Sequence, residues 1–162
     1  MKKSTFAFVC PVLILPAILF LSCANGPSFR NSKASFDDVE GKEWILSEVK
    51  AAGKTISIDR TKLETFGMGG IYTISFQGNR VSGMGAPNRF FGPYTSGSKK
   101  TLSIADVAST LMATIIEPED LKEHEYFGYL SNVTSWDLRK GKLELYSTDS
   151  AGSKATLVFM VK

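Results

Sequence analysis

The chain has 162 residues, of which 43% are hydrophobic and 22% charged, so it is long and apolar enough for one globular domain. Its 19 Lys and Arg stand against 16 Asp and Glu, and two of the lysines, Lys2 and Lys3, lie at the very start. The rest of the chain is nearly neutral, which argues against a nucleic-acid-binding protein, because such proteins carry a strongly basic face.

The first residues have the pattern of a secretory signal peptide. The two lysines precede an apolar run over residues 6–21, which is the order of charge and hydrophobicity in an export signal. The run is shorter than the roughly 20 residues of a membrane-spanning helix, and Pro11 and Pro16 would interrupt such a helix. We therefore expect residues 1–22 to direct export and then to be removed.

Cys23 follows this segment directly and is the predicted site of lipidation. The sequence Phe20-Leu21-Ser22-Cys23 resembles a bacterial lipobox, in which cleavage occurs before a cysteine that carries diacylglycerol, although the commonest form has leucine at the position of Phe20. An ordinary signal peptide with an incidental cysteine is the alternative. Several acyl chains together anchor a protein stably, since each buried methylene contributes about 0.8 kcal/mol. We expect a lipoprotein of the cell envelope, at the periplasmic face or in the outer membrane.

Lipidation and cleavage would leave the mature chain without a free thiol or an intrachain disulfide. Cys10 lies within the signal peptide, and Cys23 would be consumed by the lipid. Residues 23–40 are mostly polar and predict a flexible tether, in which Asp37, Asp38 and Glu40 are solvated rather than catalytic. The folded domain is expected over residues 41–162.

Alternation of apolar and polar residues predicts a series of short strands. In chain order they lie at 41–49, 55–60, 71–76, 80–82, 101–104, 135–138, 143–146 and 155–161. Residues 62–70 predict a loop with a single helical turn, and Gln77-Gly78-Asn79 a tight turn. The apolar run 109–116 is too short to distinguish strand from helix.

The stretch 81–94 contains three glycines and two prolines. Since neither residue type suits a strand interior, it predicts an irregular corner that Phe90, Phe91 and Tyr94 attach to the core. Further on, Pro118 and the acidic residues around it favour a helix N-terminus, and an apolar stripe follows, which predicts a helix over 118–132. The predicted fold class is α+β, with a curved antiparallel sheet, an open-barrel-like meander, packed on one main helix.

The order of these motifs resembles the META domain family, also called HslJ-like, from about residue 41 to the C-terminus. The residues that match family positions are Trp44, Leu46, Gly83, Asn88, Gly92, Tyr94, Thr110, Met112, Ala113 and Glu123, with Phe90 in place of a tyrosine. Pro87 and Thr114 stand at the two positions where the family has cysteines, and Ala86 replaces a glycine. If those positions lie close together, their joint loss is consistent, and no thiol role carries over to this chain.

The residues indicate no catalytic site, no metal site and no cofactor. His124 is the single histidine of the chain, and its neighbours Glu123 and Glu125 lie on different faces of a helix. An enzyme acting on an envelope component stays an alternative, and it would need Glu123, His124 or Asp106 beside a hydroxyl group.

The leading hypothesis is a non-enzymatic binding or scaffolding module. The resemblance implies a role in envelope stress or drug tolerance, with an unknown envelope protein or small ligand as partner, besides the membrane itself. The expected binding surface consists of Asn88, Arg89, Phe90, Phe91 and Tyr94. The alternative is that Asn88 has a purely structural role and closes its own turn through backbone hydrogen bonds. A third hypothesis is a carrier whose curved sheet encloses a lipid or another apolar ligand.

Overall fold

The computed structural model describes residues 33–113, 118 and 120–162. The strands are β1 (Glu43–Ala51), β2 (Lys54–Ser57), β3 (Thr73–Gln77), β4 (Arg80–Met84), β5 (Arg89–Ser96), β6 (Leu102–Ile104), β7 (Ala108–Ser109), β8 (Ser135–Arg139), β9 (Lys142–Thr148) and β10 (Lys154–Val161). The helices are α1 (Arg60–Thr65) and α2 (Glu123–Ser131), with single 3-10 turns η1 (Phe36–Asp38) and η2 (Ser98–Lys100). None of the helices described is long and apolar enough to cross a membrane.

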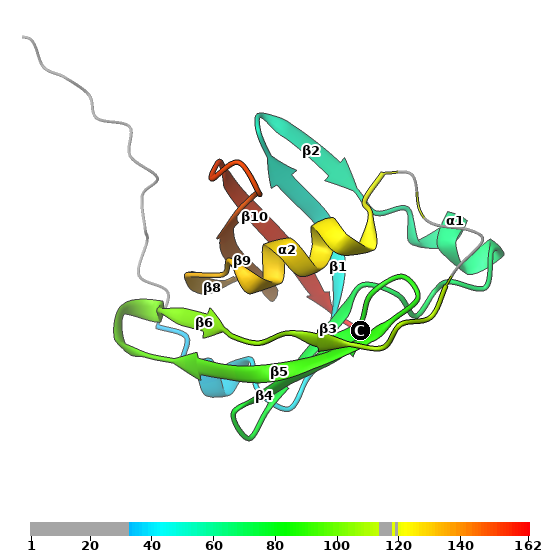
Figure 1. The fold of residues 1–162 in the computed structure, drawn as a ribbon. Coiled ribbons are helices and arrows are strands. Elements are labelled where there is room, and N and C mark those ends of the chain that lie inside the picture. The colour runs from blue at the N-terminus through cyan, green and yellow to red at the C-terminus, as the bar shows by residue number, and fades with distance from the viewer. Residues whose placement is uncertain (1–32, 114–117, 119) are drawn as a thin grey trace, which may run out of the picture. The chain divides into compact units, whose positions relative to one another are not determined.

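The ten strands form one antiparallel sheet that curls into a nearly closed barrel (Figure 1). The strand order is β6-β5-β4-β3-β1-β10-β9-β8, with β2 paired to β1 and β7 to β5. The two ends of this order meet at an isolated bridge between Thr101 and Ser135, beside which the Leu102 amide donates to the Thr134 carbonyl at 3.1 Å. The predicted curved sheet on one main helix is confirmed, although the protein is mostly β.

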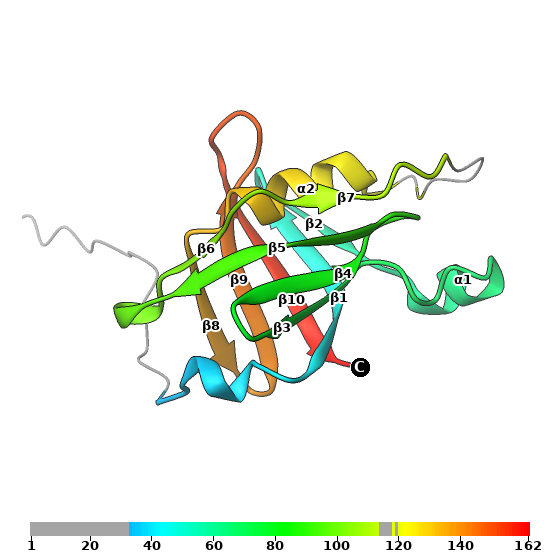
Figure 2. The same cartoon turned by 60° about the horizontal axis from the view of Figure 1, so that its bottom comes forward.

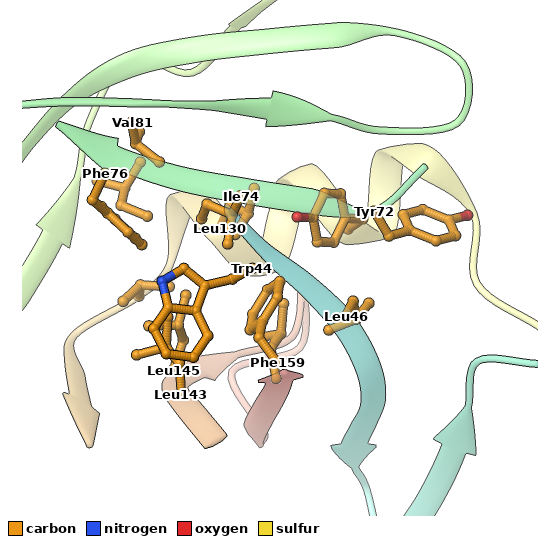
Figure 3. Close-up of a cluster of buried hydrophobic side chains, with 14 of the residues drawn as sticks. Trp44, Leu46, Tyr72, Ile74, Phe76, Val81, Leu130, Leu143, Leu145 and Phe159 are labelled. Atoms are coloured by element: carbon orange, nitrogen blue, oxygen red, sulfur yellow. The ribbon is translucent and has the colours of Figure 1, made fainter. Parts of the chain in front are cut away.

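Side chains from the strands and from α2 fill the inside of the barrel (Figure 3). Trp44, Leu46 and Phe159 are buried at its centre. On α2, Tyr126 and Leu130 are buried as the predicted stripe requires, and the Tyr126 hydroxyl donates to the Thr73 carbonyl at 3.1 Å. The helix therefore contributes to the core itself and does not cover an empty cavity.

All the predicted strands are present, but the helix prediction is wrong at its start. The helix begins at Glu123, and Pro118 lies outside it. Lys122 is extended, with φ −80° and ψ 148°, and its amide donates to the Glu125 carboxylate at 2.9 Å. The buried Leu121 is held in place because its carbonyl accepts the Tyr72 hydroxyl. This contact with Tyr72, the residue just before β3, holds the chain out of the helix ahead of Glu123.

The predicted tether is also wrong over its last residues. Phe36 and Val39 are buried, and the Phe36 ring packs against those of Phe76, Tyr94 and Trp136 with centroids 5.0 to 5.4 Å apart. The folded part therefore begins before residue 41. Residues 1–22 and Cys23 lie outside the described residues.

Strand β1 exchanges one of its neighbours halfway along its length. It pairs with β3 at residues 43–45 and with β2 at residues 48–51, and a bulge separates the two regions. At this break the Arg60 guanidinium donates to the carbonyl of Leu46 through Nε at 3.1 Å and to that of Ile71 through Nη1 at 2.8 Å. Its burial lowers the pKa of Arg60 to about 10. Arg60 thus satisfies carbonyl groups that would otherwise lack a strand partner.

Candidate functional site

The stretch 81–94 forms a regular hairpin with a short irregular connection, so the predicted corner is wrong over most of its length. Strand β4 continues to Met84 and β5 begins at Arg89, which leaves residues 85–88, with a cis peptide bond between Ala86 and Pro87, as the connection. Gly92 is required inside β5, because a Cβ there would lie 2.7 Å from the Ala105 carbonyl oxygen.

The alternation of β5 divides the predicted binding surface in two. Asn88, Phe90 and Tyr94 are only 6%, 1% and 3% exposed, so the prediction that they form a surface is wrong. Arg89 and Phe91 point outward instead, and Phe91 is 47% exposed. Side chains of a strand alternate between its two faces, so a contiguous stretch of β5 cannot lie entirely on one surface.

The two buried aromatic residues belong to the core. The Phe90 ring lies 6.0 Å from that of Tyr126 and 5.5 Å from that of Phe127 on α2. The Tyr94 ring packs on Phe76, and its hydroxyl donates to the Glu40 carboxylate. Burial and this hydrogen bond raise the pKa of Tyr94 above its ordinary value.

Asn88 is the centre of a hydrogen-bond network that joins three segments of the chain. Its side-chain oxygen accepts the Thr110 hydroxyl at 2.8 Å and the Met112 amide at 2.7 Å. Its side-chain nitrogen donates to the Met112 carbonyl at 3.2 Å and to the Glu123 carboxylate at 2.7 Å. The Asn88 side chain therefore bonds to distant segments, while its backbone carbonyl accepts the Gly85 amide at 2.6 Å and closes the connection, so the local alternative holds for the backbone and not for the side chain.

Glu123 holds the connection between β4 and β5 from the other side. One carboxylate oxygen accepts the backbone amides of Ala86 and Asn88, each at 2.6 Å. Gly85 leaves room for it, because a Cβ at that position would lie 2.5 Å from the same oxygen. Glu123 also stands in the first turn of α2, where a negative charge is favourable. We call these contacts of Asn88 and Glu123 the Asn88–Glu123 network.

The network also bears on the two positions where the family has cysteines. Pro87 adjoins Asn88, whose side chain bonds the backbone of Met112. The segment that leads towards Thr114 therefore runs beside the 85–88 connection. Thr114 itself lies outside the described residues.

The three acid–base candidates do not form an evident catalytic group. His124 and Asp106 are exposed, while both carboxylate oxygens of Glu123 accept hydrogen bonds from Ala86 or Asn88. Across the part of the chain that the structure describes, His, Cys, Asp and Glu form no group of three or more that could hold a metal ion.

The outward-facing half of the hairpin lines a groove of about 710 Å³ on β3, β4 and β5, which lie side by side in Figure 2. Its lining includes Arg80, Arg89 and Phe91, and we call it the Arg80–Arg89 groove. The Arg80 guanidinium carbon lies over the Phe91 ring, 5.3 Å from its centroid. Neither arginine forms an ion pair with any described residue. Glu43, at the rim, is paired with Lys162 at 2.9 Å.

The Asn88–Glu123 network fixes the strand that carries Arg89. The Arg89 amide donates to the Thr110 hydroxyl at 3.2 Å, and the Thr110 amide donates back to the Arg89 carbonyl at 3.0 Å. The Thr110 hydroxyl in turn donates to Asn88. A partly buried polar network therefore sets the position from which an exposed cationic side chain leaves the sheet.

Sequence reasoning missed Arg80. Its neighbours Gly78 and Asn79 have φ of +56° and +62°, as in the two-residue hairpin turns that pair the flanking residues directly. Gln77 accordingly pairs with Arg80, and Arg80 with Pro93 of β5. The turn signal was present in the sequence, but placing Arg80 beside Phe91 also required the register across the 85–88 connection.

A smaller cavity of about 190 Å³ lies between α1 and the segment that precedes α2. Apolar side chains dominate its lining, among them Leu63, Phe66 and Leu121, and Asp59 and Lys62 add charged groups. It lies beside α1, and Leu63, Tyr72 and Leu121 of its lining belong to the buried core.

Comparisons with known proteins agree with the fold. A protein from Burkholderia xenovorans, solved by NMR, superposes with a TM-score of 0.58 at 22% identity, covering 84% of this chain and 98% of that one. The crystal structure of a DUF4847 family protein from Bacteroides vulgatus ATCC 8482 gives a TM-score of 0.53 at 12% identity, covering 77% of this chain and 95% of that one. No curated protein matches. The model of the META domain matches residues 37–162, and the chain therefore belongs to the META domain family.

Proposed function

We propose that this protein is a lipid-anchored protein of the cell envelope whose META domain is a non-enzymatic binding module, with the Arg80–Arg89 groove as its binding surface. One observation carries the proposal: two arginines without an acidic partner among the described residues border a hollow that also holds an exposed aromatic ring. Arginine and aromatic side chains are enriched where proteins bind partners.

The membrane attachment rests on the sequence pattern at Cys23. The acyl chains would keep the domain at the envelope surface, and the residues before η1 would tether it there. A binding module of this kind would connect the membrane to an envelope protein or a small ligand. The role in envelope stress or drug tolerance follows from the family resemblance.

Two experiments test the proposal. In cells fed a labelled fatty acid, the wild-type protein should incorporate label and the Cys23→Ser variant should not. A wild-type protein that is cleaved but carries no label would refute the lipid anchor. In a thermal-shift screen against fractionated envelope extract, the melting temperature should rise for the wild-type protein and not for the Arg80→Gln/Arg89→Gln variant. A rise of the same size in both proteins would refute the groove as the binding surface.

Carriage of a lipid or another apolar ligand is the second candidate, and the cavity of about 190 Å³ beside α1 favours it. The packed barrel interior counts against a ligand at the centre of the sheet. Leu63→Trp would fill the cavity, so it should abolish binding of a fluorescent fatty acid if this candidate holds. The enzyme alternative predicts a phenotype for His124→Ala, because His124 is the only histidine of the chain.

A further inference from the structure

We propose that the Arg80–Arg89 groove binds an extended acidic peptide segment of a partner protein. On the side that faces the sheet, this segment would carry two carboxylate side chains four residues apart, with an apolar side chain midway between them. The inference rests on the proposed binding function and gives it a ligand class.

The spacing of the two arginines is the first step. Arg80 and Met84 lie at opposite ends of β4, and Met84 pairs with Arg89. Four residues of strand span about 13 Å, so the backbone positions of the two arginines are separated by about that distance along the groove.

An extended peptide repeats at the same interval. Its side chains i, i+2 and i+4 point to one side, and i and i+4 are also about 13 Å apart. The side chain at i+2 would then lie over the middle of the hairpin, where Phe91 pairs with Ser82. An apolar residue fits that place because Phe91 stays 47% exposed although the Arg80 guanidinium lies over one face of its ring.

Charge is the second step. Arg80 is stacked on the Phe91 ring, which orients its planar guanidinium and leaves N–H groups at its edge to donate to a carboxylate as a bidentate pair. Glu43, the acidic residue of the lining, is already paired with Lys162. The groove is therefore complementary to carboxylates and would repel a basic segment.

The shape of the surface favours a peptide over an anionic bilayer. A planar membrane cannot reach the floor of a hollow, and recognition of anionic lipid ordinarily needs a cluster of about four to eight Lys and Arg, whereas the groove supplies Arg80 and Arg89. An extended chain can lie along the strands, and the hydroxyl groups of Ser75 and Ser82 in the lining are available to its backbone.

The probe is the fluorescein-labelled peptide Glu-Ser-Phe-Ser-Glu with blocked ends, titrated with the full-length protein in neutral detergent micelles. We expect saturable binding, weakened about tenfold or more by Arg80→Gln and by Arg89→Gln. Lys54→Gln removes the same charge from an exposed position on β2 and should leave the affinity unchanged. Unchanged melting temperatures of the three variants would show that binding, not folding, was altered.

Three outcomes would overturn the inference. These are no saturable binding, equal loss of binding in Lys54→Gln, and equal affinity for the isomer Glu-Glu-Ser-Phe-Ser, in which the acids are adjacent. Displacement of the peptide by phosphatidylglycerol added to the micelles would assign the groove to lipid instead. If the peptide fails but the envelope extract still gives an arginine-dependent thermal shift, the peptide class falls and the binding function stands. If neither experiment detects binding, both the peptide class and the binding function are refuted.

Discussion

The carboxylate of Glu123 on α2 accepts a hydrogen bond from the side-chain amide of Asn88 at 2.7 Å, and its other oxygen accepts two backbone amides. Replacement by glutamine exchanges one acceptor for a donor, so Glu123→Gln leaves a donor facing a donor. We expect the free energy of unfolding to fall by about 1–3 kcal/mol, measured by urea denaturation.

The neighbouring residue supplies the control for Glu123→Gln. His124 is exposed on the same helix turn, so His124→Ala should change the free energy of unfolding by no more than about 0.5 kcal/mol. Equal stability of Glu123→Gln and the wild type would contradict the role assigned to the Asn88–Glu123 network.

Two glycines with opposite surroundings give the next prediction. A Cβ on Gly83 would lie 2.0 Å from the carbonyl oxygen of Thr73 on the paired strand, so Gly83→Ala should unfold the protein or destabilise it by about 3 kcal/mol or more. A Cβ on Gly128, within α2, meets nothing within 4 Å, and Gly128→Ala should stabilise the protein by up to about 1 kcal/mol. Thermal unfolding of both variants tests this, and a shift of the same sign in both would contradict it.

Phe36 tests where the folded domain begins. Its ring is buried among three other aromatic rings, so Phe36→Ala should lower the free energy of unfolding by about 3–5 kcal/mol. Phe66, which is 56% exposed, is the matched control, and Phe66→Ala should lose much less. Urea denaturation compares the two variants. Equal losses of unfolding free energy would show that residue 36 belongs to the tether and not to the folded domain.

High pH should unfold the protein through its tyrosines. Burial raises the pKa values of Tyr94, Tyr126, Tyr129 and Tyr146 above the ordinary 10.0. A group with a higher pKa when folded stabilises fully below pH 10, and its contribution is lost as the pH rises above that. Arg60 has the opposite sign, since burial lowers its pKa to about 10 and its contribution to stability grows as the pH rises above that value. Four groups outweigh one, so stability should decline above pH 10.

Tyrosinate absorbance and circular dichroism, followed together during an alkaline titration, check this. The native protein should delay tyrosine ionisation until it unfolds, and both signals should then change in one step. The urea-unfolded chain is the control, and its tyrosines should titrate near their ordinary pKa of about 10. Early ionisation of the native protein without loss of structure would contradict the prediction.

The sequence predicts local features well and distant contacts poorly. Alternation locates the strands because each exposes one face to the core, as in β9, where Leu143 and Leu145 are buried and their neighbours are not. The predicted start of the helix was wrong because it depends on the contact between Tyr72 and Leu121, which are 49 residues apart in the chain. For the same reason, no local pattern could tell that Asn88 bonds Thr110, Met112 and Glu123.

The sequence predicted only part of the Arg80–Arg89 groove, again because the rest depends on contacts between distant residues. Arg89 and Phe91 were identified because they stand in the unusual stretch 81–94, whereas Arg80 lies just before it in an ordinary strand. What joins them is hairpin register, and that depends on the 85–88 connection, whose conformation follows from contacts with Glu123.

Arg60 has a consequence for the hairpin of β1 and β2. Its guanidinium takes over the carbonyls where β1 leaves β3, while β1 continues along β10 and β2 pairs with β1 alone among the described strands. The tip of this hairpin, the exposed residues Ala52 and Gly53, can therefore be lengthened or exchanged for a foreign loop without disturbing the barrel. It offers a grafting position for tags or epitopes, provided that Arg60 is kept.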